Sequence, residues 1–354
     1  MNAGPQPLTT AKLLLFLAVL LTVVHGAGTE SLDIAVAGYG LSIGNSKRFT
    51  GLRINAVDAD VERITGVNLT LWNPRPNPEA AYNGLALGLI GTKAARIDGI
   101  ALGGIGVNAR QNLRGLAAGT LGVGAGRLTG VAAGLITVDI KDRVRGIVLS
   151  GFWTGACKQL DGLAISPGIA NAANIRGATL GLIAGAEQDL TGVSLALGGF
   201  YAARLRGLAV GGFGGGAEKL RGVSIGGLFV ASTDLQGIAC SLGGIGGKRL
   251  DGIVLAGLGL GASERIRGVA IGGLLSFAPE VTGLSAGALN GLYIDRVDLE
   301  DFLHVRLANE RFTGLSIGLV NYTARLKGVQ LGLLNYAGNN PRWLRLLPLV
   351  NVHV

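Results

Sequence analysis

Few residues in this sequence have a type and spacing that could support chemistry. The 354 residues include only three histidines and two cysteines, at His25, His304, His353, Cys157 and Cys240. Metal centres need His, Cys or carboxylate ligands grouped at short spacing, whereas these residues are scattered along the chain. The sequence therefore predicts no metal, no cofactor and no catalytic residue, and a protein that is not an enzyme.

The one dense acidic stretch has two interpretations. Within residues 294–306 it gathers Asp295, Asp298, Asp301 and His304. One interpretation is a loop that binds a cation or docks a partner. The plainer one, which we favour, is an irregular repeat whose charged side chains face solvent.

A second set of charged residues is periodic. Seven basic residues directly precede a recurring glycine, at Arg114, Arg145, Arg176, Arg206, Arg221, Arg267 and Lys327, and Asp98, Asp161 and Asp251 hold the same place elsewhere. If successive repeats stack, these residues form one net basic edge. On an exported protein such an edge would attract anionic surface polymers or outer-membrane lipid and not nucleic acid. The plainer interpretation is a charged edge that keeps the chain soluble.

The elements that must position these residues are repeats. The tetrad "large apolar, any residue, Gly, aliphatic" occurs eighteen times between Gly51 and Gly328, mostly at intervals of 15 or 16 residues. The other intervals are 14, 18 and 31 residues, and the longest predicts two periods with Asp298 in place of a missing glycine. We number positions from this glycine, as position 0. The chain then consists of about nineteen repeats of one architecture.

Within each repeat, small and aliphatic residues alternate. The segment Gly222–Gly226 has the sequence Gly-Val-Ser-Ile-Gly, and this period of two is typical of a β-strand. Helices are excluded, because the 62 glycines would each cost about 1 kcal/mol relative to Ala. The sequence predicts an all-β protein.

Two arrangements of these strands compete. The favoured one is a β-solenoid or β-roll of 15-residue coils. In it the chain turns near position 0 and near +4 and +5, and apolar side chains at −2, +1, +3 and +6 point inward. The alternative is an antiparallel meander that closes as an outer-membrane β-barrel and acts as a pore or anchor, with aliphatic residues at +1 and +3 facing lipid. Successive repeats show no odd–even difference, which favours the solenoid, whereas the mean hydropathy of +0.47 favours the barrel.

The ends of the chain differ from the repeats. Residues 1–26 predict a signal peptide, because the apolar core Leu13–Val24 is shorter than the roughly 20 residues that span a bilayer as a helix. We further expect an N-terminal cap or first strand at 27–48 and the tandem repeats at 49–340, irregular at 291–311. A C-terminal capping strand is expected at 341–354.

Two clean copies of a GLxIGLxN-type unit lie near the C-terminus, at Gly314–Asn321 and Gly328–Asn335. The same pattern begins at Gly40–Gly44, and in most other repeats the Asn is replaced. The sequence resembles the leptospiral-type bacterial surface repeat proteins, which carry tandem units of this kind behind an export signal. The resemblance implies an exported protein at the cell surface or outer membrane of a bacterium, with a structural or interaction role and no catalysis. Self-association is left open.

Overall fold

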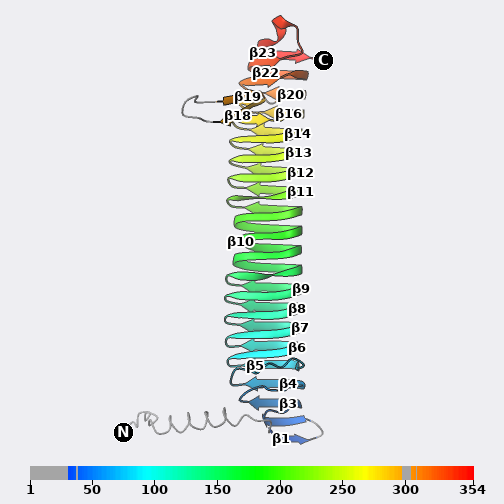
Figure 1. Ribbon diagram of the computed structural model, residues 1–354, viewed down its shortest axis with the longest axis vertical. Coiled ribbons are helices and arrows are strands. Elements are labelled where there is room, and N and C mark those ends of the chain that lie inside the picture. Colours follow the sequence, from blue (N-terminus) through cyan, green and yellow to red (C-terminus); the bar gives the residue numbers. More distant parts are fainter. Residues whose placement is uncertain (1–30, 37–38, 297–303, 308) are drawn as a thin grey trace, which may run out of the picture. The chain divides into compact units, whose positions relative to one another are not determined.

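The computed structural model describes residues 31–36, 39–296, 304–307 and 309–354. The chain divides into two compact units, residues 1–158 (unit 1) and 159–354 (unit 2). It is all-β, as predicted, and forms a β-solenoid of about nineteen turns with a repeat of about 15 residues. Figure 1 shows the coils stacked within each unit.

The strands of unit 1 are numbered along the chain. They are β1 (Ser31–Val36), β2 (Tyr39–Gly44), β3 (Arg48–Asn55), β4 (Arg63–Thr70), β5 (Ala81–Gly88), β6 (Gly91–Gly103), β7 (Gly106–Gly119), β8 (Gly122–Gly134) and β9 (Thr137–Ser150). The next strand, β10 (Trp153–Gly211), is continuous through several coils and begins in unit 1.

Unit 2 continues with strands of similar length and ends in shorter ones. They are β11 (Gly214–Gly226), β12 (Phe229–Ser241), β13 (Gly244–Ala256), β14 (Gly259–Gly272), β15 (Leu275–Phe277), β16 (Glu280–Ala286), β17 (Leu289–Asn290), β18 (Leu292–Arg296), β19 (His304–Leu307), β20 (Arg311–Ile317), β21 (Val320–Thr323), β22 (Arg325–Ala337) and β23 (Leu346–His353). One 3-10 turn, η1 (Arg342–Leu344), precedes β23.

Successive coils pair in parallel and in register. In unit 1 Gly99 pairs with Gly115, and in unit 2 Gly207 pairs with Gly222, so equivalent residues stack on one another. The same parallel pairing links β2 to β9 in unit 1, and β10 to β17 and β20 to β22 in unit 2. The solenoid is therefore confirmed. The alternative of an antiparallel meander closing as a β-barrel is wrong.

The repeat glycine has the conformation that the predicted turn requires. All eighteen glycines at position 0 have φ between 113° and 145°, a region that residues with a Cβ rarely adopt. A Cβ at Gly207 would also lie 2.1 Å from the carbonyl oxygen of Gly192 in the preceding coil. A second bend lies at +5 and +6, as at Gly227 and Leu228, slightly later than predicted.

The interior of each coil combines one large side chain with several small ones. All eighteen residues at −2 are buried, as predicted. The next inward position in the same strand is +2, where Ala117 and Ala209 are fully buried. Because side chains alternate between the two faces of a strand, the residues at +1 and +3 point outward.

The prediction that the aliphatic residues at +1, +3 and +6 form the core is therefore wrong. Ile225 at +3 is 41% exposed and Leu228 at +6 is 58% exposed. The reason is the alternation of side chains along the strand: Leu220 at −2 and Ser224 at +2 are both buried, so the residues at +1 and +3 lie on the opposite face. The chain pairs its strands as a solenoid but turns its aliphatic residues outward, which explains its high mean hydropathy.

The 31-residue interval between Gly283 and Gly314 does not contain the additional coil that the repeat spacing predicts. Gly283 pairs directly with Gly314, and Asn290 with Asn321, so the coils on either side of the interval are neighbours. The extra residues carry β18 and β19, which pair antiparallel in a separate two-stranded sheet. The expectation of a degenerate coil, with Asp298 replacing a glycine, is therefore wrong, although Asp298 itself lies outside the described residues.

Each unit carries one antiparallel strand paired with its parallel coils. In unit 1, β1 pairs antiparallel with β2, and in unit 2, β23 pairs antiparallel with β22. These strands lie within the segments 27–48 and 341–354 that the sequence suggested as caps. The predicted signal peptide, residues 1–26, lies outside the described residues.

Candidate interaction surface

The seven basic residues at −1 lie on the outer side of their coils, and all of them are exposed. Arg114 and Arg145 belong to unit 1 and the other five to unit 2. Arg206 pairs in register with Arg221, so their backbones are about 4.8 Å apart. Arg114 and Arg145 are separated by one coil, which carries Thr129 at this position. The structure therefore stacks these residues in columns within each unit.

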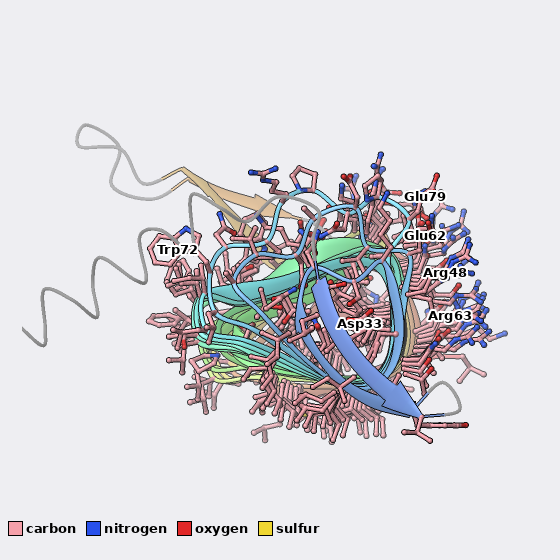
Figure 2. The ribbon with its side chains drawn as sticks, turned by 90° about the horizontal axis from the view of Figure 1, so that it is seen from below. Asp33, Arg48, Glu62, Arg63, Trp72 and Glu79 are labelled. Atoms are coloured by element: carbon pink, nitrogen blue, oxygen red, sulfur yellow. The ribbon has the colours of Figure 1, made fainter. Side chains whose placement is uncertain are left out.

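A second basic column lies at position −3, and sequence reasoning missed it. It includes Arg48, Arg63, Arg96 and Arg127 in unit 1 and Arg204, Lys219, Arg249, Arg265, Arg311 and Arg325 in unit 2. Figure 2 shows Arg48 and Arg63 pointing outward at one edge, with Trp72 on the opposite side. The signal was present in the sequence, because these residues recur with the same period two positions earlier. We call positions −3 and −1 together the basic edge.

Ion pairs between neighbouring coils neutralise acids on or beside this edge. In unit 1 they are Arg48–Glu62, Arg114–Asp98 (3.9 Å) and Lys158–Asp142 (2.9 Å). In unit 2 they are Arg204–Asp189 (2.5 Å), Arg249–Asp234 (2.5 Å), Arg249–Glu264 (3.7 Å), Arg265–Asp251 (3.1 Å) and Arg311–Glu280 (3.2 Å). By contrast, Arg206, Arg221 and Arg267 form no ion pair with any described residue. The uncompensated charge of the edge in unit 2 is therefore positive.

Two of the paired acids, Asp234 and Asp142, have a lowered pKa. The hydrogen bond from Arg249 is the main cause that holds the pKa of Asp234 below its ordinary value. The hydrogen bond from Lys158 lowers the pKa of Asp142 in the same way. The edge thus combines neutralised pairs with the unpaired Arg206, Arg221 and Arg267, an arrangement that can bind anions.

The acidic break is only partly described. Asp298 and Asp301 lie outside the described residues. Asp295 belongs to β18 and His304 to β19, where Arg296 pairs with His304 across the antiparallel sheet. The backbone thus brings the two strands of the break together, beside the coils rather than within them.

A buried polar cluster lies inside the first coils of unit 1, and sequence reasoning missed it as well. Arg53 occupies position +2, and both it and Asp58 are fully buried. Arg53 Nη1 donates to Asp58 Oδ1 at 2.5 Å and to Asn68 Oδ1 at 2.7 Å. Asp58 Oδ2 accepts hydrogen bonds from Thr70 Oγ1 at 2.7 Å and from the Tyr82 hydroxyl at 2.9 Å. An Arg at a position that is otherwise mostly Ala, Ser or Thr was the available signal.

This cluster is electrostatically balanced. Burial by itself raises the pKa of Asp58, but the Arg53 charge and several hydrogen-bond donors hold it below its ordinary value. Burial, together with the neighbouring Asp58 carboxylate, raises the pKa of Tyr82 well above its ordinary value. Asp58 is therefore a buried anion and Tyr82 a neutral donor. Since both are enclosed, the cluster stabilises the coils and does not face a substrate.

The GLxIGLxN-type units form a short asparagine ladder in unit 2. Asn290 Nδ2 donates to Asn321 Oδ1, and Asn321 Nδ2 donates to Asn335 Oδ1, both at 2.7 Å. Asn335 Nδ2 in turn donates to the Gly332 carbonyl at 3.0 Å. The ladder covers the coils whose sequence matches the unit.

No group of three or more His, Cys, Asp and Glu residues that could hold a metal ion occurs in the part of the chain that the structure describes. In that same part, no helix has the length and apolarity needed to cross a membrane. Comparisons with protein families, with curated proteins and with solved structures found no match to this chain.

Proposed function

We propose that this chain is an exported, cell-surface or envelope-associated repeat protein of a bacterium, with an interaction role and no catalytic activity. Its basic edge binds anionic polymers of the surface. The observation that carries the proposal is the stacking of unpaired arginines, because Arg206, Arg221 and Arg267 repeat along one edge of unit 2 without acidic partners among the described residues. A row of cations along one edge attracts the anions of a polymer.

The resemblance to leptospiral-type surface repeat proteins supports the location, since those proteins carry the same unit behind an export signal. The apolar segment Leu13–Val24 supports export independently. The fold supports a binding role rather than catalysis, because the charged groups lie on an open edge, and open edges do not exclude water from a reaction.

The proposal is tested with the full mature chain on immobilised heparin, used as a generic polyanion, at increasing NaCl concentration. We expect binding that weakens steeply with salt, and a shallower salt dependence for the triple variant Arg206→Gln, Arg221→Gln and Arg267→Gln. A matched control removes the same number of charges away from the edge, at Arg75→Gln, Lys93→Gln and Arg342→Gln. Binding that does not depend on salt, or equal loss in both triple variants, would refute the proposal.

A further inference from the structure

From the coil of Gly66 onward, the outward positions +1, +3, +5 and +6 form one continuous uncharged surface in each unit, which we call the apolar face. From the coil of Gly40 to that of Gly328, these positions contain no Asp, Glu, Lys or Arg. At the +5 and +6 bend, Leu228, Leu242 and Leu258 are 58%, 79% and 60% exposed. Because β11 to β14 pair in register, these leucines belong to successive coils and form a ridge. Soluble proteins rarely expose aliphatic residues in so extended an array.

The basic edge borders the apolar face along its whole length in unit 2. The two surfaces meet at the repeat glycine, with −3 and −1 on one side of it and +1 and +3 on the other. Arg221, Val223 and Ile225 illustrate this order within one coil, around Gly222. Every coil that exposes an aliphatic pair therefore presents a polar or charged border beside it, and the uncompensated charge of that border is positive.

Aromatic residues add a further property of the bend. Trp72 at +6 is 50% exposed, and Phe152 and Trp153 at +6 and +7 are 65% and 49% exposed. Phe213 at +6 is also exposed, at 65%. Trp in particular is enriched where an apolar layer meets water, because its ring is apolar and its N–H is a donor.

We propose that the apolar face lies on an anionic lipid layer, with its aliphatic and aromatic side chains at the acyl boundary and the basic edge on the lipid phosphates. This proposal rests on the proposed function, since the basic edge is the same. Charge complementarity selects the lipid over a second copy of the chain. A second copy carries the same net positive charge of +9, whereas lipid phosphates supply the negative charge that the unpaired arginines of the border can bind.

The test measures sedimentation of the full mature chain with vesicles of phosphatidylcholine and phosphatidylglycerol, and with vesicles of phosphatidylcholine only. We expect tighter binding to the anionic vesicles. The variant Leu228→Ser, Leu242→Ser and Leu258→Ser should lower the partition coefficient at least about 100-fold, because three exposed leucines no longer enter the acyl boundary. The control variant with Met at the same three positions keeps the apolar surface and should bind like the wild type.

Cys240 provides a second, positional readout. It occupies position +3 of the apolar face and pairs in register with Ile225 and Leu255. An environment-sensitive fluorophore attached there, in a Cys157→Ala background, should shift to the blue on anionic vesicles. Arg75→Cys, away from the face, gives the control position in a Cys157→Ala and Cys240→Ala background and should remain in water.

The outcomes separate the two proposals. If the Ser variant binds vesicles like the wild type while the probe at Cys240 stays in water, the lipid proposal is overturned and heparin binding by the basic edge still stands. If sedimentation shows a dimer that the Ser variant dissociates, and neither vesicle type is bound, the apolar face is an interface between copies and the proposal is equally overturned. Equal binding to both vesicle types would remove the role given to the basic edge.

Discussion

The first coils of unit 1 and the coils that follow them fill the same interior position with opposite chemistry. At +2, β3 and β4 place the fully buried Arg53 and the buried Asn68, which share the carboxylate of Asp58. The equivalent residues of β6 and β7 are Ala101 and Ala117, both fully buried. The first region is held by an ionic network, whereas the second is closed by small apolar side chains.

The difference shows that two properties of a coil vary independently. One is its frame, meaning the glycine at position 0 and the parallel pairing of the backbones, and the other is its filling, meaning the side chain at +2. Both regions have the same glycine conformation at position 0 and the same parallel register. The large residue at −2 is also buried in both, as Ile64 and Leu113 illustrate. The frame is therefore common to both regions, and the residue at +2 decides whether the interior of the coil is charged or apolar.

The largest effect is expected for Asp58→Ala, which removes the buried ion pair with Arg53. This substitution leaves the fully buried Arg53 without its anion, and we expect it to lower the free energy of unfolding by about 3–5 kcal/mol. Chemical denaturation combined with hydrogen exchange of the β3 to β5 amides measures the loss. As a control, Glu62→Ala removes an acid whose partner, Arg48, is exposed, and such pairs contribute little. Equal losses in the two variants would mean that the buried network is not what holds this region.

The second-largest loss of stability is expected on substituting the glycine at position 0, which belongs to the frame of both regions. We expect Gly66→Ala in the charged region and Gly130→Ala in the apolar region to lower the free energy of unfolding by about 3 kcal/mol each, because both combine a strained φ with a steric clash. The new Cβ would lie 2.4 Å from the Gly51 carbonyl oxygen in the first case and 2.0 Å from that of Gly115 in the second.

The matched control for these two variants is Gly124→Ala in the same unit. Its φ is not in the positive range, and its nearest neighbour, the Asn108 amide nitrogen, lies at 3.4 Å, an ordinary contact. Urea denaturation should therefore find it close to the wild type. If Gly66→Ala and Gly130→Ala differed by much more than 1 kcal/mol, frame and filling would not be independent.

The pH dependence of the charged region should be smaller and of a defined sign. The pKa of Asp58 is lower in the folded chain than its ordinary value, so between these values the unfolded chain binds more protons. The stability that Asp58 contributes is complete above about pH 4. It is lost as the pH falls through the folded pKa. Denaturation from pH 7 to pH 2 should show this loss in the wild type and a weaker acid dependence in Asp58→Asn. The same acid slope in both proteins would contradict the assignment.

Periodicity in the sequence was sufficient to predict the coil, because a large apolar residue at −2 and a glycine at position 0 recur in all eighteen repeats. It was not sufficient to predict which side of the strand is inside. Hydrophobicity places Ile225 in the core, but the alternation that buries Leu220 at −2 also buries Ser224 at +2 and turns Ile225 outward. Which face of the strand lies inside depends on how the whole coil closes, and no single strand segment reveals it.

The charged features divide in the same way. The column at −1 could be predicted because it directly precedes the glycine that defines the repeat. The pairing of Arg249 with Asp234 depends on which residues of neighbouring coils lie in register. The Arg53–Asp58 pair depends on a bend between β3 and β4 that the repeat pattern does not contain. Local spacing therefore predicts columns, whereas partners across coils require the register.

The smallest predicted effect concerns two serines at +2 in unit 2. Ser224 is buried between Ala209 and Ala239 in the neighbouring coils, and its Oγ has no hydrogen-bond partner among the described residues. Ser194 is buried too, but its Oγ donates to the Ala184 carbonyl and accepts from Thr179 Oγ1, both at 3.2 Å.

The two serines should therefore respond to Ala with opposite signs. Ser224→Ala removes a buried hydroxyl without breaking a bond, so we expect the free energy of unfolding to rise by about 1 kcal/mol. Ser194→Ala leaves Thr179 Oγ1 without its acceptor and should lower it by about 1 kcal/mol. Both changes delete the same atom at the same place in the coil, so denaturation of the pair isolates hydrogen bonding from packing. Destabilisation by both would show that packing of the side chain at +2, rather than its hydrogen bonding, determines the stability of the apolar interior. The side chain at +2 would then be less free to vary than the comparison of Arg53 with Ala117 indicates.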